Sequence, residues 1–226
     1  MLIGILQTGE APDALRPASG DYPDMFERLL VGHGFRFRTW RVVDMDFPAS
    51  VHDADGWLIT GSRHGAYEDL PFIKPLEEFI RNAYGEHVPL VGICFGHQII
   101  AQALGGKVEK FTGGWSVGPQ SYDFGGETIT MNAWHQDQVT EKPPAATRVA
   151  TAPFCENAAL VYDTRAFTVQ AHPEFEDEFV EGLIEKRGRG KVPDAQLDAA
   201  KAALGAPLSS PAVANRIAEF FKHPRD

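Results

Sequence analysis

Residues 90–104 read LVGICFGHQIIAQAL, and this stretch decides the fold class. Its first four residues are apolar or glycine, which is typical of a short strand buried on both faces. Cys94 follows at once, and the apolar spacing over residues 99–104 indicates a helix that ends at Gly105-Gly106. A strand that leads into a helix is the repeating unit of α/β proteins, in which ligands bind at the carboxyl ends of the strands.

The same alternation of strand and helix extends on both sides of this stretch. Apolar or alternating runs predict strands over residues 2–6, 35–43, 57–59 and 167–170. Helices are expected over residues 72–84 and from Asp21 onward, because Asp21 is a good cap and Pro23 suits a first helical turn. We therefore predict an α/β fold, an open and mostly parallel sheet of the flavodoxin-like kind with helices on both faces.

The second half of the chain has a different pattern. Gly and Pro pairs and short alternating segments over residues 108–162 predict hairpins, and so a small antiparallel addition in the middle of the chain. Residues 188–191 are interpreted as a flexible link among helices expected over residues 177–186, 194–204 and 213–221. We interpret residues 1–226 as a single domain, with a core to about residue 186 and a helical C-terminal extension over residues 187–226.

Composition excludes several classes of protein. The chain has 226 residues, 43% of them hydrophobic, which is enough to build a core. Its 31 acidic and 21 basic residues give a net charge of −10, which disfavours sequence-independent binding to nucleic acid. The N-terminal run lacks the basic lead-in of a signal peptide, and no run approaches the about 18 apolar residues of a membrane span, so we expect a cytoplasmic protein with no membrane association. The two cysteines, Cys94 and Cys155, lack the spacing of a zinc site, so we expect free thiols and no metal.

Cys94 is the first candidate for chemistry, because it stands between strand and helix in a Gly-x-Cys-x-Gly frame. A sharp turn at this junction strains the backbone of the central residue and exposes its side chain, and Gly92 and Gly96 leave room for it. The N–H groups of the following helix favour a thiolate, whereas an ordinary thiol, with a pKa of about 8.5, is mostly protonated at neutral pH. We therefore interpret Cys94 as a nucleophile rather than as a buried structural cysteine.

A base for this thiol is expected at the end of the last predicted strand, in Gln170-Ala-His172-Pro-Glu174. Histidine is the usual base near neutral pH, and a carboxylate two residues on would orient the imidazole and support its positive charge. Among eight histidines, His172 alone combines the end of a strand on this edge with such a neighbour. A third loop, Thr60-Gly61-Ser62, follows another strand, and the N–H groups of Gly61 and Phe95 are candidate donors to an oxyanion.

Together these motifs resemble the class I (triad-type) glutamine amidotransferase domain, and the resemblance extends from residue 1 to about residue 175. It implies that Cys94 is the nucleophile, His172 the base and Glu174 the third member of a catalytic triad. Within this family, the sequence most resembles the stand-alone members that are similar to the glutaminase domain of GMP synthase. In such enzymes the cysteine attacks the side-chain amide of glutamine and forms a thioester, which releases ammonia and then glutamate without a metal or organic cofactor.

The resemblance also implies roles for residues around the triad. Gly61 and Phe95 match the oxyanion donors, Gln98 matches a glutamine that holds the substrate, and His135 lies in a segment beside the substrate. The oxyanion loop departs from the Gly-Gly-Pro or Gly-Pro-Gly of many members, because it reads Gly-Ser-Arg-His-Gly over residues 61–65. In this loop Arg63 and His64 are either contacts for a substrate carboxylate or solvated side chains.

Three functions remain open at this point. The chain contains no phosphate-binding loop and no room for a synthetase domain, so a glutaminase would deliver ammonia to a separate, acceptor-activating partner subunit. The alternative is a stand-alone hydrolase of γ-glutamyl peptides or amides that uses the same triad. A third reading is a non-catalytic binding relative, in which Cys94 would react with iodoacetamide no faster than Cys155 does.

Overall fold

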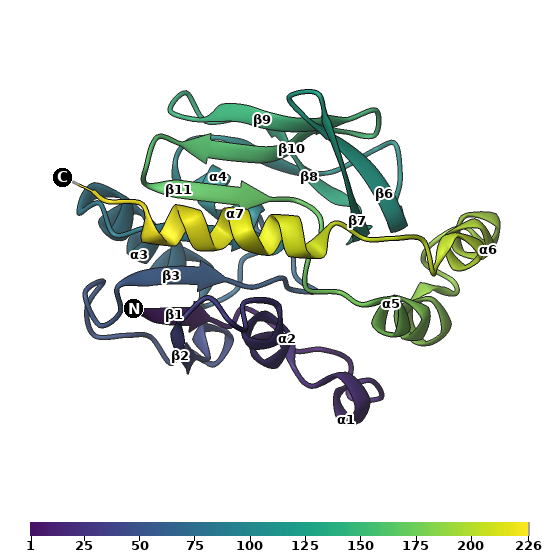
Figure 1. Cartoon of the computed structure of the whole chain (residues 1–226), viewed down its shortest axis with the longest axis horizontal. Helices are drawn as coiled ribbons and strands as arrows, with labels where there is room; N and C mark the ends of the chain where they lie inside the picture. Colours follow the sequence, from purple (N-terminus) through teal and green to yellow (C-terminus); the bar gives the residue numbers. More distant parts are fainter. Residues whose placement is uncertain (226) are drawn as a thin grey trace.

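The computed structural model describes residues 1–225, and a nine-stranded sheet runs through it (Figure 1). Half of this sheet is parallel and contains, in spatial order, β2 (Arg36–Trp40), β1 (Leu2–Leu6), β3 (Gly56–Ile59), β4 (Leu90–Ile93) and β11 (Ala166–Val169). In chain order these strands are arranged 2-1-3-4-5, which is the flavodoxin-like order. The predicted α/β fold with a parallel sheet is therefore confirmed.

The expected antiparallel addition extends the same sheet beyond β11. Its four strands are, in spatial order, β10 (Cys155–Tyr162), β9 (Thr147–Ala152), β6 (Ser116–Phe124) and β7 (Glu127–His135). A separate two-stranded sheet pairs β5 (Lys107–Lys110) with β8 (Asp137–Glu141). The carboxyl end of β11 thus lies between the parallel strands and the hairpins, so residues that follow β11 can contact both halves.

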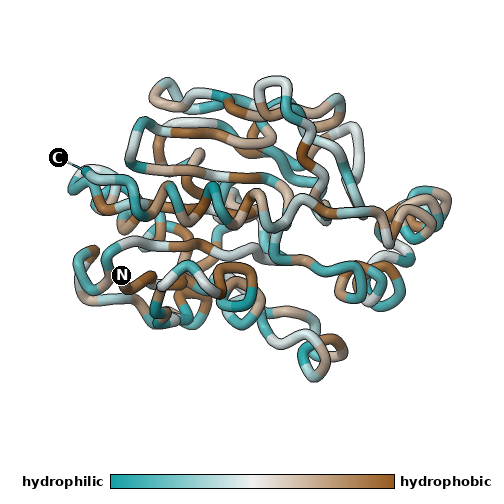
Figure 2. The backbone as a smooth tube through the Cα atoms, viewed as in Figure 1, coloured by the Kyte–Doolittle hydropathy of each residue, from teal (hydrophilic) through white to brown (hydrophobic). Residues whose placement is uncertain are grey.

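Helices cover both faces of the parallel half, as predicted. One face packs against α3 (Ile73–Gly85) and α4 (Phe95–Ala103), and the other against α2 (Tyr22–Leu29) and α7 (Ser210–Lys222). Side chains of β3 alternate between these two cores, with Trp57 and Ile59 in one and Leu58 in the other. Apolar residues concentrate on these strands, whereas α7 alternates between apolar and polar residues (Figure 2).

The boundaries of β2 and α4 differ from the prediction by several residues. β2 ends at Trp40 because a 3-10 turn, η1 (Val42–Asp44), buries Val42 and closes on Met45 in a left-handed conformation. α4 begins at Phe95, four residues before the predicted start, because its first turn contains glycine and polar residues that do not contribute to an apolar spacing. A short helix, α1 (Arg16–Ser19), precedes α2.

The end of the chain forms a third apolar cluster. Helix α5 (Asp177–Leu183) continues into a π-helical turn, η2 (Ile184–Gly188), and α6 (Asp194–Ala203) packs beside it. The segment interpreted as a flexible link forms a turn in which the N–H groups of Lys191 and Val192 donate to the Gly188 carbonyl. Helix α7, which belongs to the expected C-terminal extension, packs Val213 and Phe221 against the sheet. No helix within residues 1–225 is long and apolar enough to cross a membrane.

Candidate active site

Cys94 lies at the sharp turn between β4 and α4, with backbone angles φ 53° and ψ −102°. This left-handed conformation is unusual for a residue other than glycine. Both neighbouring glycines are required by packing: a Cβ placed on Gly92 would lie 2.4 Å from the Gly96 carbonyl oxygen, and one placed on Gly96 would lie 2.2 Å from the Ile59 carbonyl oxygen. The Gly-x-Cys-x-Gly frame therefore allows α4 to approach β3 and β4 closely while the cysteine side chain faces a cavity.

His172 and Glu174 follow β11 and are both buried. Nδ1 of His172 lies 2.7 Å from Oε1 of Glu174, which fixes the orientation of the ring. Phe175 stacks on the imidazole at a centroid distance of 3.8 Å and an interplanar angle of 4°. The His172 N–H donates to the Asn132 carbonyl of β7 at 2.8 Å, so the antiparallel half of the sheet also positions this loop.

The electrostatics of His172 link it to both Cys94 and Glu174. Burial favours the neutral imidazole, but the negative charges of Cys94 and Glu174, and side-chain hydrogen bonds to both, outweigh burial and raise the pKa of His172 to about 10. Nε2 of Gln170 lies 3.7 Å from Sγ of Cys94. The structure thus brings the three residues of the predicted triad together, and the raised pKa of His172 favours a charged imidazole beside Cys94 at neutral pH.

Gly61 and Phe95 lie beside this pair. A Cβ placed on Gly61 would lie 3.0 Å from Cε1 of His172 and 3.9 Å from Cβ of Cys94. The hydroxyl of Thr8 donates to the Thr60 carbonyl at 3.0 Å, so the Gly61 N–H, in the same peptide unit, is directed away from Thr8. Phe95 is the first residue of α4, and its N–H therefore has no acceptor within the helix.

Gln98 and His135 also line the cavity, on the side of α4 and β7. Gln98 donates from Nε2 to the Asp137 carbonyl at 2.8 Å and to Oε1 of Gln170 at 3.1 Å, which joins α4 to the start of β8 and to the residue after β11. Burial, followed by the charge of His172, lowers the pKa of His135 to about 3. His135 is therefore a neutral imidazole beside a charged one.

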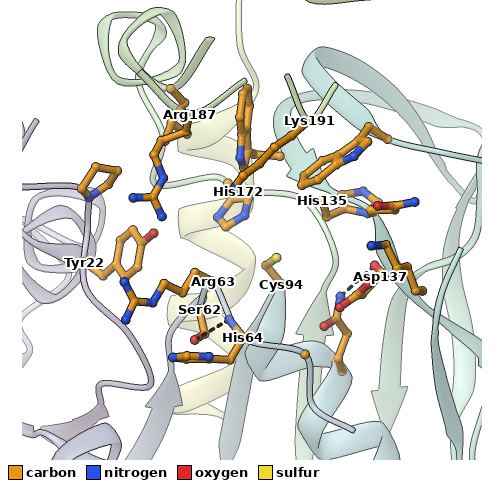
Figure 3. Close-up of a pocket in the computed structure, with 18 of the residues that line it drawn as sticks. Tyr22, Ser62, Arg63, His64, Cys94, His135, Asp137, His172, Arg187 and Lys191 are labelled. Atoms are coloured by element: carbon orange, nitrogen blue, oxygen red, sulfur yellow. Dashed lines mark hydrogen bonds between the residues drawn. The ribbon is translucent and has the colours of Figure 1, made fainter. Parts of the chain in front are cut away.

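A cavity of about 500 Å³ opens above Cys94 (Figure 3). Sequence reasoning missed three of the residues that line it, Tyr22, Arg187 and Lys191. Tyr22 stacks on Phe175 and lies on one side of Cys94 with Arg187, whereas His135 and Asp137 lie on the other side. For Tyr22 the sequence indicated only that it follows the cap of α2. No local pattern indicated that Arg187 and Lys191 reach the cavity.

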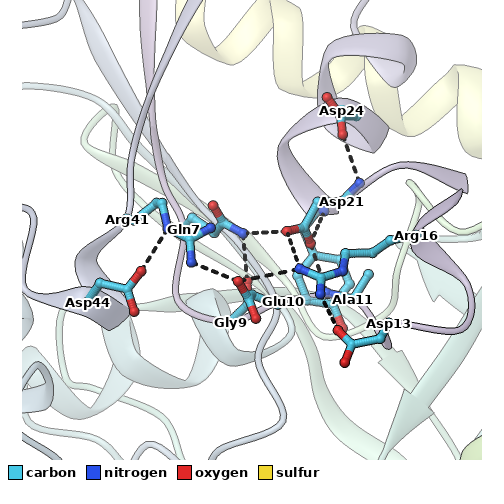
Figure 4. Close-up of polar contacts among 11 residues, drawn as sticks. Gln7, Gly9, Glu10, Ala11, Asp13, Arg16, Asp21, Asp24, Arg41 and Asp44 are labelled. Carbon is cyan, nitrogen blue, oxygen red and sulfur yellow. Dashed lines mark hydrogen bonds and ion pairs between the residues drawn. The ribbon is translucent and has the colours of Figure 1, made fainter.

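A polar network around Asp21 holds the first turn of α2 in place (Figure 4). Asp21 caps α2: its carboxylate accepts hydrogen bonds from the N–H groups of Tyr22 and Ala11, each at 2.8 Å, and from Nε2 of Gln7 at 2.9 Å. Gln7 directly follows β1, so the network ties the first turn of α2 to the carboxyl end of that strand. Within residues 1–225 no cluster of three or more His, Cys, Asp or Glu side chains is arranged to hold a metal ion.

Comparison with known proteins agrees with this architecture. The family described as Glutamine amidotransferase class-I matches residues 21–179. A glutamine amidotransferase-like protein of Schizosaccharomyces pombe is 30% identical over 204 residues, which cover 80% of this chain and 82% of the relative. Gamma-glutamyl peptidase 4 of Arabidopsis thaliana is 31% identical over 184 residues, which cover 74% of this chain and 73% of that protein.

A GMP synthase of Bordetella avium is 32% identical over 181 residues, but these cover 68% of this chain and only 33% of the synthase. The crystal structure of a glutamine amidotransferase from Thermotoga maritima superposes with a TM-score of 0.74 at 20% identity, covering 98% of each chain, and shows the shared fold. The protein is thus an α/β protein with a buried cysteine, histidine and glutamate at the edge of its sheet. It belongs to the class I glutamine amidotransferase family.

Proposed function

We propose that the protein hydrolyses γ-glutamyl amide bonds through a thioester on Cys94. The observation that carries this proposal is the arrangement of a strained cysteine and a histidine charged by its neighbours in one cavity, with a buried glutamate that orients the histidine. Membership of the family and the similarity to γ-glutamyl peptidases support the same chemistry. Glutamine is the simplest substrate of this class.

In the first half of the reaction the Cys94 thiolate attacks the γ-carbonyl carbon of the substrate. The N–H groups of Gly61 and Phe95 stabilise the oxyanion that develops on the carbonyl oxygen. His172 gives its proton to the departing nitrogen, the C–N bond breaks and the glutamyl group remains on the sulfur. Glu174 keeps the imidazole oriented and stabilises its charge.

In the second half water hydrolyses the thioester. His172, now neutral, accepts a proton from the water as the oxygen attacks the same carbonyl carbon. The C–S bond then breaks, which releases glutamate and restores the thiolate beside the imidazolium. Gln98 and His135 are proposed to hold the glutamyl group, because both line the cavity and Gln98 is hydrogen-bonded to Asp137, two residues after His135.

Two substrate classes fit this mechanism. With glutamine the leaving group is ammonia, which a separate acceptor-activating subunit would consume, as the similarity to part of a GMP synthase suggests. With a γ-glutamyl peptide the leaving group is an amino acid or peptide. The size of the cavity, about 500 Å³, and the extent of the match to γ-glutamyl peptidases favour this second candidate.

Release of glutamate by the purified protein tests the proposal. We expect turnover of glutamine or of a γ-glutamyl peptide, and we expect Cys94→Ala to reduce it by about 10³-fold or more. Circular dichroism of the variant should match that of the native protein. Turnover by the Cys94→Ala variant near that of the native protein would refute the thioester mechanism.

A direct comparison of substrates separates the two candidates. Glutamate release from glutamine and from a panel of γ-glutamyl dipeptides is measured with the same preparation. Activity on the dipeptides and none on glutamine would exclude the isolated chain as a glutaminase. The reverse result would favour ammonia delivery to a partner.

A further inference from the structure

Four basic side chains that line the cavity form no ion pair among the described residues, and one of these, Lys110, partly offsets the charge of Asp137. Arg63, Arg187 and Lys191 form no ion pair and no side-chain hydrogen bond with any residue of the described chain, 1–225. Elsewhere arginines such as Arg41 and Arg189 are paired with carboxylates at 2.7 and 2.8 Å. In a chain of net charge −10, unpaired basic groups gathered in one cavity indicate a site for an anion.

The acidic side chains of the cavity do not neutralise these groups. Glu10 is bound to Arg41 at 2.7 Å, outside the cluster. Glu68 accepts a hydrogen bond from the Gly65 N–H at 2.8 Å and lies 3.4 Å from Nδ1 of His64. Asp137 accepts from the Tyr67 hydroxyl at 3.1 Å. The positive charge of Arg63, Arg187 and Lys191 therefore remains available to a ligand.

The chain positions these groups through two separate segments. Arg63 lies two residues after Gly61, in the loop that departs from the family pattern. Arg187 lies in the π-helical turn η2, where it is half-buried, and Lys191 lies in the turn that follows. π-helical turns insert an extra residue into a helix and are frequent at functional sites. Both segments face the cavity from the end of the sheet at which Cys94 lies.

The two arginines and His135 lie on different sides of Cys94. In Figure 3 the guanidinium groups of Arg63 and Arg187 lie with Tyr22 on one side of Cys94, and His135 and Asp137 lie on the other. A γ-glutamyl substrate also has two parts, the glutamyl group and the leaving amine, which extend in opposite directions from the attacked carbon. If Gln98 and His135 hold the glutamyl part, the leaving amine extends toward the two arginines.

We propose that Arg63, Arg187 and Lys191 form a subsite for a carboxylate carried by the leaving amine. This inference rests on the proposed function and makes the substrate a γ-glutamyl peptide with a free C-terminal carboxylate. Ammonia, the leaving group of glutamine, carries no group for this subsite to bind. Arginine is suited to the task, because its planar guanidinium binds a carboxylate through two parallel hydrogen bonds.

The test compares γ-glutamylglycine with γ-glutamylglycinamide, which has the same length but lacks the carboxylate. For the native protein we expect kcat/KM to be at least about tenfold higher with γ-glutamylglycine, since its carboxylate would gain charge-assisted hydrogen bonds from the guanidinium groups. In Arg63→Met and Arg187→Met this preference should fall toward one, mainly through a loss of kcat/KM for γ-glutamylglycine. Circular dichroism checks that each variant is folded.

Lys186→Met is the matched control. Lys186 lies next to Arg187 in the same turn, is exposed and does not line the cavity, so its removal changes the net charge equally. We expect this variant to keep the native preference between the two substrates. A loss of preference in Lys186→Met would mean that overall charge, and not the subsite, selects the substrate.

Two further results would overturn the subsite. One is a native protein with equal kcat/KM for the two substrates. The other is an equal loss for both substrates in the arginine variants, which would place the α-carboxylate of the glutamyl group against these side chains. Failure of the proposed function is distinct, because it would appear as turnover of both substrates by Cys94→Ala.

Discussion

At Cys94 the backbone adopts a conformation that a side chain disfavours, and the surrounding hydrogen bonds hold it there. The Cys94 N–H donates to the Val169 carbonyl at 2.9 Å, and the Cys94 carbonyl accepts from the Gln98 N–H at 3.0 Å. A residue other than glycine in such a conformation costs about 1–3 kcal/mol. The two hydrogen bonds offset this cost and hold the sulfur between the end of β4 and the cavity.

This strain predicts an unusual order of stability at position 94. We expect Cys94→Gly to be more stable than Cys94→Ala by about 1 kcal/mol, because glycine adopts φ 53° without a steric penalty. Urea unfolding of the two variants measures the difference. The opposite order, in which alanine has its ordinary advantage, would mean that the turn is not strained.

The two cysteines are expected to differ in reactivity. Burial, followed by the charge of Cys94, raises the pKa of Cys155 to about 12, so its thiol is inert at neutral pH. Iodoacetamide should therefore label Cys94 much faster than Cys155, as peptide mapping would show. His172→Ala should slow the labelling of Cys94, because the imidazolium stabilises the thiolate. Equal labelling of both cysteines would favour a non-catalytic relative.

The pairing of His172 with Glu174 predicts a shift in pH dependence. The imidazolium is present below the raised pKa of about 10 and is lost above it, so activity should fall as the pH rises through that region. In Glu174→Gln, one of the two negative charges is removed, and we expect the alkaline limb to move down by about one unit or more. Turnover should also fall by about 10²-fold or more.

The raised pKa of His172 also makes the free energy of unfolding depend on pH, because the unfolded chain has a histidine of ordinary pKa. Because the folded-state pKa of His172 lies above its ordinary 6.5, the stabilising contribution is complete below pH 6.5 and is lost as the pH rises toward 10. Glu174→Gln should therefore reduce the stability difference between pH 6 and pH 10, measured by urea unfolding. An alkaline limb and a stability profile that both match the native protein would contradict the role of Glu174.

At the level of elements, the junction of β4 and α4 leaves no space for a larger residue at position 96. Gly96→Ala places its Cβ 2.2 Å from a backbone oxygen of β3, so α4 must move. We expect a loss of about 1–3 kcal/mol in the free energy of unfolding, with reduced activity because Cys94 moves as well. Gly85→Ala, at the end of α3 where no atom lies within 4 Å of the new Cβ, is the control. Equal effects of the two variants would exclude close packing as the cause.

Local patterns were sufficient for the parallel half of the fold and insufficient for the rest. Short apolar runs predicted β1, β3, β4 and β11, since strands buried on both faces are continuous in hydrophobicity. They did not show that β6, β7, β9 and β10 continue the same sheet, because strand pairing depends on partners far along the chain. The contact of His172 with Asn132 of β7 depends on that continuation and was equally beyond local reasoning.

The residues of the site also divide into those that local patterns predicted and those that they did not. Cys94, His172 and Gly61 each follow a predicted strand, and the rule that ligands bind at the carboxyl ends of strands places them together. Tyr22 reaches the cavity from α2, and Arg187 reaches it because α5 continues as a π-helical turn. Hydrogen bonding five residues apart gives no periodicity that a short sequence could show, so Arg187 was not predicted.

For the whole molecule, α7 connects the end of the chain to its core. Phe221 is buried, and a Cβ placed on Gly56 of β3 would lie 2.9 Å from its ring. The expected division into a core and a C-terminal extension at about residue 186 stays a prediction, and α7 is the place to test it. A helix that merely extends the core could lose its apolar contacts at little cost.

Phe221→Ala is expected to reduce the free energy of unfolding by about 3–5 kcal/mol, because it leaves a cavity between α7 and the sheet. Glu219→Ala, on the exposed side of the same helix, should change it by less than about 0.5 kcal/mol. Urea unfolding measures both. A small effect of Phe221→Ala would mean that the packing of α7 contributes little to the stability of the core.

The most direct test of the whole account is the detection of the covalent intermediate. The protein is mixed with a γ-glutamyl peptide, quenched in acid during turnover and digested, and the peptides are examined by mass spectrometry. We predict that the peptide containing Cys94 carries one added glutamyl group, and that His172→Ala reduces its formation. Turnover of the substrate with no such adduct on Cys94, or with the adduct on another residue, would contradict the account.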